Sequence, residues 1–292
     1  MSAQPDLDVL MIGHFAKDLL VVDGVGERAS GGAVFYGSVP LRRIGLRVGV
    51  ATRMHPEDYP RLEELRREGV EVFVTAAPQT SGIENVYRSA DMERRICKPM
   101  GFAGPFSPGD IPAVKAKVFL VIPIIAGEVD LPLLASLAGR GPVGMDVQGF
   151  VRVREGDQLV FKHWPDMQEG LSHITYLKVD QAEAELLTGE RDLERAARRL
   201  AACGPREIVL TQASGVTVFA GGTVHRAPFT SKHLSGRTGR GDTCFATYVG
   251  KRLTSSAEEA CRWAGAVTSL KQERPGPWRG TVADLEAYWR RP

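Results

Sequence analysis

The hydrophobic pattern of the chain alternates between short apolar runs and stretches of helical periodicity. Apolar runs of four to six residues are typical of strands that are buried on both faces of a parallel sheet. We interpret the following runs as strands: 8–13, 47–52, 71–75, 118–122, 143–146, 176–179 and 207–211, followed by a hairpin of 216–220 and 223–227. Helices are expected at 59–68, 131–138 and 192–202, twice within 242–270, and after Thr281. This alternation predicts an α/β fold with a doubly wound, mostly parallel sheet flanked by helices.

Two segments interrupt this alternation. Residues 19–30 and 83–97 have strand-like patterns separated by polar turns, and neither leaves room for a crossover helix. We interpret them as a small antiparallel sheet that projects from the main sheet as a lid. No linker or repeat divides the chain, so we expect a single domain over 1–292, with lid segments inserted at about 19–31 and 78–100.

The composition excludes several classes of protein. The 292 residues are 43% hydrophobic and 25% charged, which is ordinary for a globular chain and unlike a disordered one. A net charge of +2 indicates neither a nucleic-acid partner nor an anionic membrane. The longest apolar run, 118–126, contains Pro123 and is far shorter than the ~20 residues that span a bilayer. Four widely spaced cysteines without a CxxC pair, and no signal peptide, predict free thiols and a cytoplasmic protein.

The strongest local motif is the glycine-rich turn from Thr238 to Asp242, directly before a predicted helix. Unhindered N–H groups there, with about half a positive charge from the helix dipole, form a site suited to phosphate. A carboxylate at this position suits a base that removes the proton of an attacking hydroxyl. The same residues also fit a simple turn in which Asp242 caps the helix. The sequence has no GxxxxGK[ST] loop, so the site is not of the Walker type.

Four ordered elements resemble those of a known family. Gly236–Asp242 is similar to a D-T-T-G-A-G-D signature, and Gly31-Gly32 opens a helix that ends at Ile44-Gly45. Asp18 follows the first strand, and Asp180-x-x-Glu183 is similar to an N-x-x-E element with Asp in place of Asn. Together they resemble the ribokinase-like (PfkB) carbohydrate kinases over essentially the whole chain. The resemblance implies the ribokinase-like fold and ATP-dependent phosphorylation of a hydroxyl group.

The resemblance also implies roles at the phosphate end of the site. Asp242 would be the catalytic base, and the backbone of Gly239, Arg240 and Gly241 would complete the anion hole. ATP would bind with Mg²⁺, and Glu183 would hold the metal through water, although the D-x-x-E pattern also fits a capping box at a helix start. The residues implied in nucleotide binding are Lys178, Asp180, Thr211, Gly215, Val267 and Pro275. Because Ala213 stands where the family has the glycine of T-x-G, we expect an altered nucleotide loop.

Stretches 13–18, 83–87, 146–153 and 236–244 resemble the myo-inositol kinase-like branch of this family. The residues then implied in substrate binding are Asp18, Gly31, Gly32, Glu84, Asn85, Asp146 and Gln148, with Arg152 reaching substrate or phosphate. Such a pocket would be acidic and would suit a neutral polyol, with myo-inositol as the leading substrate. A kinase of another sugar or of a nucleoside remains an alternative. A non-catalytic sugar- or nucleotide-binding regulator is another, and the intact Asp242 argues against it.

Two further expectations concern ions and partners. Many members of the family bind K⁺ beside the anion hole through the first Asp of D-T-T-G, where this chain has Gly236. Arg237 adds a positive charge beside that position, so we expect weak activation by monovalent cations. The expected partners are a small polyol or sugar and ATP, and a homodimer formed through the lid is left open.

Overall fold

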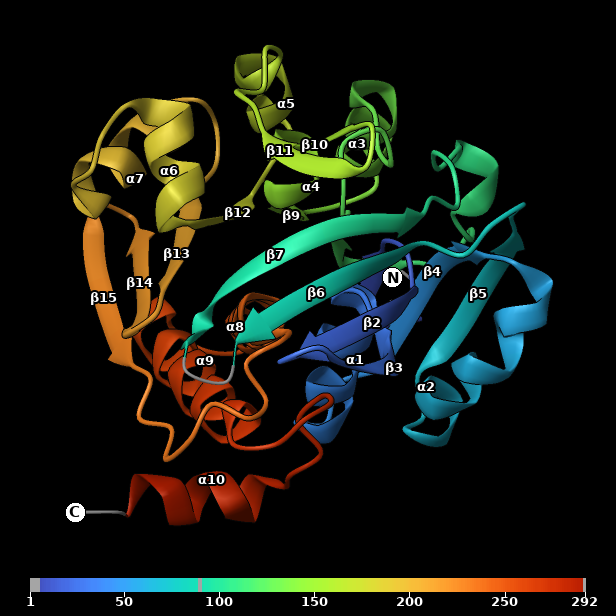
Figure 1. Cartoon of the computed structure of the whole chain (residues 1–292). Coiled ribbons are helices and arrows are strands. Elements are labelled where there is room, and N and C mark those ends of the chain that lie inside the picture. Colours follow the sequence, from blue (N-terminus) through green and yellow to red (C-terminus); the bar gives the residue numbers. More distant parts are fainter. Residues whose placement is uncertain (1–5, 89–90, 291–292) are drawn as a thin grey trace.

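The computed structural model describes residues 6–88 and 91–290, and a large sheet forms the centre of this part of the chain (Figure 1). Within it the sheet has nine strands, in the order β15-β14-β13-β12-β9-β8-β1-β4-β5. The strands are β1 (Leu7–Ile12), β4 (Val48–Met54), β5 (Glu71–Ala76), β8 (Ala116–Val121), β9 (Val143–Asp146), β12 (Tyr176–Asp180), β13 (Glu207–Gln212), β14 (Gly215–Ala220) and β15 (Thr223–Pro228). All neighbouring pairs from β13 to β5 are parallel, whereas β14 and β15 add an antiparallel hairpin at one edge. Each strand expected from the apolar runs is present, which confirms the doubly wound α/β prediction.

Helices cover both faces of the sheet, with an apolar core under each layer. One face carries α1 (Ala33–Arg43), α2 (Glu63–Arg67), α8 (Arg240–Arg252) and α9 (Ala257–Gln272). The other face carries α3 (Leu131–Ala138), α5 (Met167–Ser172), α6 (Gln181–Thr188) and α7 (Leu193–Ala201). The period of a strand explains why the apolar runs are continuous: in β1, Val9 and Met11 enter one core while Leu10 and Ile12 enter the other.

The C-terminal helix α10 (Val282–Trp289) closes a smaller apolar cluster of Ala266, Val267, Trp278 and Leu285 beside α9. In residues 6–88 and 91–290, none of the helices has both the length and the apolar character needed to cross a membrane.

The helix expected at 59–68 differs from the structure. The chain forms a 3₁₀ helix, Pro56–Leu62, before the short α2 begins. Pro60 has no N–H and cannot continue an α-helical bonding pattern, which accounts for the tighter turn. A second 3₁₀ helix spans Pro108–Asp110.

The segment after β9 is also more regular than expected. Gln148 and Arg152 follow the last residue of an expected strand, where no further element was expected, and they begin α4 (Gln148–Val151) and β10 (Arg152–Glu155). β10 pairs with β11 (Gln158–Phe161) in a hairpin whose turn contains Gly156 at a φ of 62°, a conformation that favours glycine. The four-residue alternation in each strand is too short to be distinguished from a loop by pattern alone.

The predicted lid is a separate four-stranded sheet, called here the lid sheet. Its strands, within the described residues, are β2 (Ala16–Val22), β3 (Val25–Gly31), β6 (Gly82–Arg88) and β7 (Asp91–Gly101), in the order β3-β2-β6-β7. The expected antiparallel arrangement holds within each hairpin but is wrong for the central pair, because β2 and β6 are parallel. β2 and β6 each begin a few residues after a parallel strand of the main sheet ends, so both leave that sheet in the same direction.

The order of the strands places the site. From β1 the chain first builds outward through β4 and β5, and then through β8, β9, β12 and β13 on the other side. Ligands in open α/β sheets bind where this direction reverses, outside the carboxyl ends of the strands. The lid sheet begins at that edge, since β2 follows β1 (Figure 1).

Candidate active site

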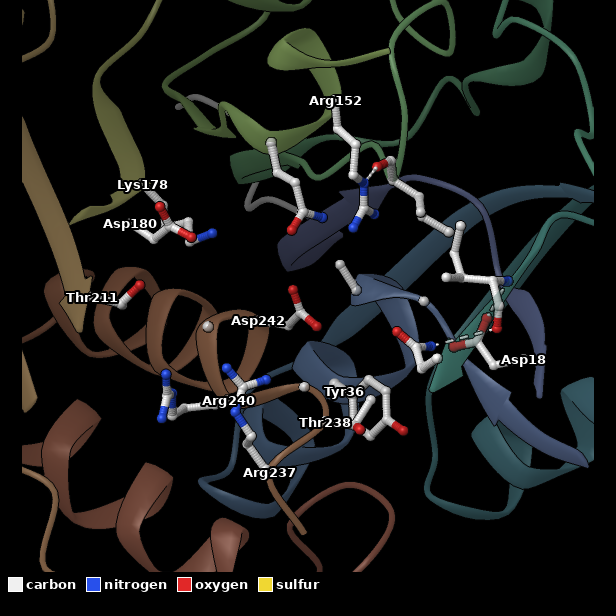
Figure 2. A pocket seen from close by; sticks show the side chains of 18 residues that line it. Asp18, Tyr36, Arg152, Lys178, Asp180, Thr211, Arg237, Thr238, Arg240 and Asp242 are labelled. Carbon is white, nitrogen blue, oxygen red and sulfur yellow. Dashed lines mark hydrogen bonds between the residues drawn. The ribbon is translucent and has the colours of Figure 1, made fainter. Parts of the chain in front are cut away.

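A pocket of about 140 Å³ lies between the carboxyl edge of the main sheet, the lid sheet and the start of α8 (Figure 2). Most of the residues named from the sequence line it: Asp18, Gly32, Asn85, Gln148, Lys178, Asp180, Thr211, Gly239, Arg240, Gly241 and Asp242. The pocket is also lined by Ala33, Tyr36, Ile83 and Ile124, for which the sequence had indicated no role, and by Thr238, the first residue of the glycine-rich turn. Arg152 and Arg237, noted for their charge, also line the pocket.

The other residues named from the sequence do not line this pocket, and three of them were expected at the acceptor. Glu84 and Asn85 were both candidates for the acceptor site; successive side chains of a strand point to opposite faces, and of the two Asn85 lines the pocket. Gly31 lies behind Asp18, where a Cβ would come within 2.1 Å of the Asp18 carboxylate, so this glycine makes room for the acid. Asp146 is 2% exposed and contacts Lys178.

Three residues expected at the nucleotide also lie elsewhere. Gly215 is buried in β14, paired with Gln212 across the hairpin. Val267 is fully buried in the apolar cluster beside α10, where packing leaves it no surface for an adenine ring. Pro275 lines a different cavity, of about 500 Å³, next to Trp278.

The glycine-rich turn has the backbone geometry that an anion site needs. Gly239 is the N-cap of α8 with a φ of 84°, and a Cβ there would come within 2.2 Å of the Tyr36 ring, so two independent constraints require glycine. The first helical bond of α8 runs from Thr243 N to Gly239 O, at 3.0 Å. The N–H groups of Gly241 and Asp242 precede that bond and lie at the positive end of the helix dipole. The turn is therefore suited to hold phosphate oxygens.

Asp242 occupies the middle of the pocket. Figure 2 shows its carboxylate between Lys178, Asp180 and Thr211 on one side and Asp18 on the other. Below it lie the guanidinium groups of Arg237 and Arg240. A hydroxyl held near Asp18 and a phosphate held near the turn would thus meet at Asp242, which is where a base is needed.

A buried ion-pair network lies beside Asp180. Lys178 Nζ donates to Asp146 Oδ1 at 3.1 Å, and it lies 3.0 Å from Asp146 Oδ2 and 3.6 Å from Glu183 Oε2. Burial opposes the charged form of Lys178, but Asp146 and Glu183 outweigh it and raise the pKa of Lys178 above its ordinary value. Lys178 is therefore a permanent positive charge in the pocket wall, and Asp146 holds it in place.

Asp180 and Glu183 form the capping box that the sequence left as an alternative. Asp180 Oδ1 accepts from Glu183 N at 2.8 Å, and Glu183 Oε2 accepts from Asp180 N at 2.7 Å, at the start of α6. Burial raises the pKa of Glu183, and its Oε1 has no hydrogen-bond partner among the described residues. In that part of the chain no three His, Cys, Asp or Glu side chains are grouped to hold a metal ion directly. The free Oε1 fits a contact through water to a metal carried by the phosphates.

The acceptor end is built from the lid sheet, the segment around Ile124 and the starts of α4 and β10. Asp18 Oδ1 accepts from Ile83 N at 2.8 Å, which fixes one oxygen of the carboxylate against β6. Asn85 Oδ1 accepts from the Cys97 thiol at 3.4 Å, so the side-chain amide is oriented from the neighbouring strand. Arg152 Nε donates to Ile124 O at 2.8 Å.

The lid also touches the phosphate turn directly. Tyr87 Oη lies 3.0 Å from Thr238 Oγ1, which joins β6 to the start of the turn. This contact links the position of the lid sheet to that of the turn.

Comparison with known proteins identifies the family. Residues 146–281 match the pfkB family of carbohydrate kinases. A pyrophosphate-dependent kinase in the ribokinase family, solved with a pyrophosphate analogue and myo-inositol, is 38% identical, with a TM-score of 0.89 over 96% of this chain and 99% of its own. This chain belongs to the ribokinase family. The resemblance seen in the motifs is thereby confirmed, and the protein is a PfkB-type kinase.

Two other proteins similar to this ribokinase-family kinase are named for different acceptors. A structure from the conversion of a pyrophosphate-dependent myo-inositol-1 kinase into a myo-inositol-3 kinase is 37% identical, with a TM-score of 0.87 over 96% of this chain and 97% of its own. A cytidine kinase of Thermococcus kodakarensis is 27% identical over 94% of this chain and all of its own length. The relatives therefore differ in acceptor, while the kinase family is common to them.

Among the described residues, the lining of the whole pocket holds three carboxylates and four cations. The lining carboxylates are Asp18, Asp180 and Asp242, and the lining cations are Arg152, Lys178, Arg237 and Arg240. Two of the expected carboxylates, Asp146 and Glu84, do not line the pocket, whereas the basic residues converge on it. From the sequence, Arg237 and Arg240 were noted in the glycine-rich motif, Lys178 was expected at the nucleotide, and Arg152 was expected at the substrate or phosphate.

Proposed function

We propose that this kinase transfers a phosphoryl group from inorganic pyrophosphate to a hydroxyl of myo-inositol. The observation that carries the proposal is the group of cations, Lys178, Arg237 and Arg240, around the start of α8. Pyrophosphate has no base or sugar to recognise, so its affinity depends on charge and on backbone N–H groups. The sequence had led us to expect ATP, and pyrophosphate replaces it here as the proposed donor.

The size of the pocket and the residues around it favour the smaller donor. The pocket of about 140 Å³ is smaller than the ~300–1,000 Å³ of sites that hold whole drug-sized ligands. Of the residues expected at adenine, Val267 is buried and Pro275 lines a different cavity. The two relatives at 37–38% identity described above are, or derive from, pyrophosphate-dependent kinases.

The acceptor end supports a neutral polyol. The Asp18 carboxylate can accept hydrogen bonds from ring hydroxyls, the Asn85 amide can both accept and donate them, and Gln148 adds a second amide. A hydroxyl that pairs with a buried carboxylate contributes strongly to selection, because an analogue without it leaves the carboxylate unpaired. Myo-inositol is present with one of these relatives, and we extend that substrate to this chain.

The mechanism follows from the order of groups in the pocket. Asp242 takes the proton of the attacking hydroxyl, and the N–H groups of Gly241 and Asp242 stabilise charge on the transferred phosphoryl group. Arg240 and Lys178 hold the donor and stabilise the departing phosphate. Mg²⁺ bound with the donor would neutralise phosphate charge, with Glu183 Oε1 as its contact through water. The lid sheet excludes water, which would otherwise compete as the acceptor.

Initial rates with pyrophosphate and with ATP test the donor, each with myo-inositol, ribose, fructose, adenosine and cytidine as acceptors. We expect kcat/KM to be highest for pyrophosphate with myo-inositol. A higher kcat/KM with ATP would overturn the proposed donor and leave the acceptor in place. A preference for adenosine or cytidine would overturn the proposed acceptor, and a preference for cytidine would agree with the cytidine kinase of Thermococcus kodakarensis.

A further inference from the structure

A lysine ammonium is buried directly beneath the phosphate turn. Lys271, near the C-terminal end of α9, is 2% exposed, and its Nζ donates to the carbonyl oxygens of Gly236 and Thr238. The same ammonium lies 4.9 Å from the centre of the Tyr36 ring, so an aromatic face covers it as well. The hydrogen-bond acceptors of this buried cation are therefore carbonyls of the segment that leads into the turn.

The segment that leads into the phosphate turn is held against α9 through both the N–H and the carbonyl of Gly236. Gly236 N donates to Gln272 O at 2.8 Å while its carbonyl accepts from Lys271. A Cβ at Gly236 would lie 1.8 Å from Arg274 O, so only glycine allows this approach. The close packing explains why a side chain from α9 reaches under the turn.

A charge at this position is costly. Burial of an ammonium group removes its hydration, and two carbonyls and an aromatic ring replace only part of it. Burial lowers the pKa of Lys271 to about 7, although Asp242 acts in the opposite direction. A neutral side chain would fill the space at lower cost, so the position of this charge points to a role at the turn.

The peptide geometry indicates that role. A peptide group is planar and trans, so its C=O and N–H point in opposite directions. The Thr238 carbonyl points to Lys271, and the N–H of Gly239 in the same peptide therefore points away from Lys271; Gly239 lines the pocket. Lys271 thus fixes the orientation of an N–H donor from the side opposite to the ligand.

We propose that Lys271 is a positioning residue that serves as the resident cation of the phosphate turn. Its ammonium holds the carbonyls of Gly236 and Thr238, orients the Gly239 N–H and places positive charge behind Asp242. A tethered ammonium performs this task without a dissolved monovalent ion, so wild-type activity does not depend on K⁺. The proposal rests on phosphoryl transfer at the turn and applies to either donor.

Replacement of Lys271 by a small neutral side chain and by a long neutral side chain tests the proposal. Lys271→Ala removes the ammonium and leaves space, and we expect kcat to fall by about 10²-fold, the effect of losing one preorganised donor in a transition state. Methylammonium, ammonium or K⁺ should restore part of this loss, and tetramethylammonium, which is too large, should not. Lys271→Met fills the space without charge and should lose the same activity with no rescue by any cation.

Two comparisons control this experiment. Lys251→Ala removes a lysine on α8 whose Nζ lies 3.9 Å from the Trp263 ring, away from the pocket, and should leave kcat and its cation response unchanged. Lys271→Gln is a neutral side chain long enough to reach one carbonyl; it should fold, as thermal unfolding would show, and still lose kcat.

Three results would overturn the role of Lys271. They are a kcat of the Gln variant close to wild type, equal rescue of the Ala variant by tetramethylammonium, and a K⁺ requirement in the wild type. A wild-type chain with no kinase activity on any acceptor would instead overturn the proposed function. Binding of pyrophosphate, measured by calorimetry on the same variants, separates the two cases, because it requires no turnover and should weaken in Lys271→Ala and recover with ammonium.

Discussion

Replacement of Asp242 by Asn tests the base at the centre of the mechanism. The change conserves volume at the start of α8, and capping does not depend on it, because Gly239 is the N-cap. Loss of a first-turn carboxylate costs ~0.3–1 kcal/mol of folding free energy. Loss of a general base lowers kcat by ~10²–10⁴, which corresponds to ~2.7–5.4 kcal/mol of activation free energy. Since the carboxylate also repels an anionic donor, we expect the donor KM to stay constant or fall.

The assay is the release of phosphate at saturating myo-inositol and pyrophosphate, with the dissociation constant of pyrophosphate from calorimetry. Asp192→Asn is the matched control, because Asp192 caps α7 far from the pocket and accepts from Arg195 N at 2.8 Å. It should lower the melting temperature as much as Asp242→Asn does and leave kcat unchanged. A kcat of Asp242→Asn within about threefold of wild type would remove this residue from the chemistry. Loss of pyrophosphate binding would instead give Asp242 a structural role in the turn.

The remaining predictions concern other parts of the same pocket and its support. Asp18→Asn should raise the KM of the polyol by ~10–100-fold, the effect of losing a hydrogen bond to a charged group, with kcat nearly constant; a fall in kcat alone would contradict this. Arg237→Met should raise the KM of pyrophosphate and leave that of the polyol unchanged in steady-state rates. Glu183→Gln should raise the Mg²⁺ concentration needed for half-maximal rate. A loss of thermal stability alone would mean that Glu183 acts only in the capping box of α6. Burial lowers the pKa of His14 to about 3 from 6.5, so below pH 6.5 the unfolded chain binds a proton that the folded chain does not. The contribution of His14 to the free energy of unfolding should therefore fall by up to ~1.4 kcal/mol per pH unit as the pH decreases from 6.5 to about 3. In denaturant titrations His14→Gln should show a smaller loss between pH 6.5 and 3.

The main sheet could be predicted from the sequence because its strands are buried on both faces. A continuous apolar run such as 118–122 is typical of a strand whose two faces are both covered by helices. The lid sheet was harder, since the direction of pairing between β2 and β6 depends on where each hairpin leaves the main sheet. The hairpin of β10 and β11 was missed because four residues carry too little periodicity.

Some residues of the site could likewise be predicted from the sequence, and others could not. Residues of the glycine-rich motif could be placed because their function depends on the local backbone, and the positive φ of Gly239 is a property of the turn itself. Val267 and Glu84 could not be placed, because each depends on the face that its helix or strand turns to its neighbours. Lys271 carries no sequence signal, since a single lysine near the end of a helix is common, and only burial under Gly236 and Thr238 sets it apart.

The distribution of charge in the pocket also limits how it can select an acceptor. A pocket lined by carboxylates alone would exclude sugar phosphates strongly, because a second anion would face like charges. Here the acceptor end holds one carboxylate, Asp18, and Arg152 lines the same pocket (Figure 2). Exclusion of a phosphorylated acceptor is then weak, and selection rests on hydroxyl pairing with Asp18 and Asn85, where an unpaired buried group costs ~1–3 kcal/mol. Deoxy-inositols should therefore lose more kcat/KM than inositol phosphates do, and Arg152→Met should increase the discrimination against the phosphates; the opposite ranking would show that charge sets the specificity.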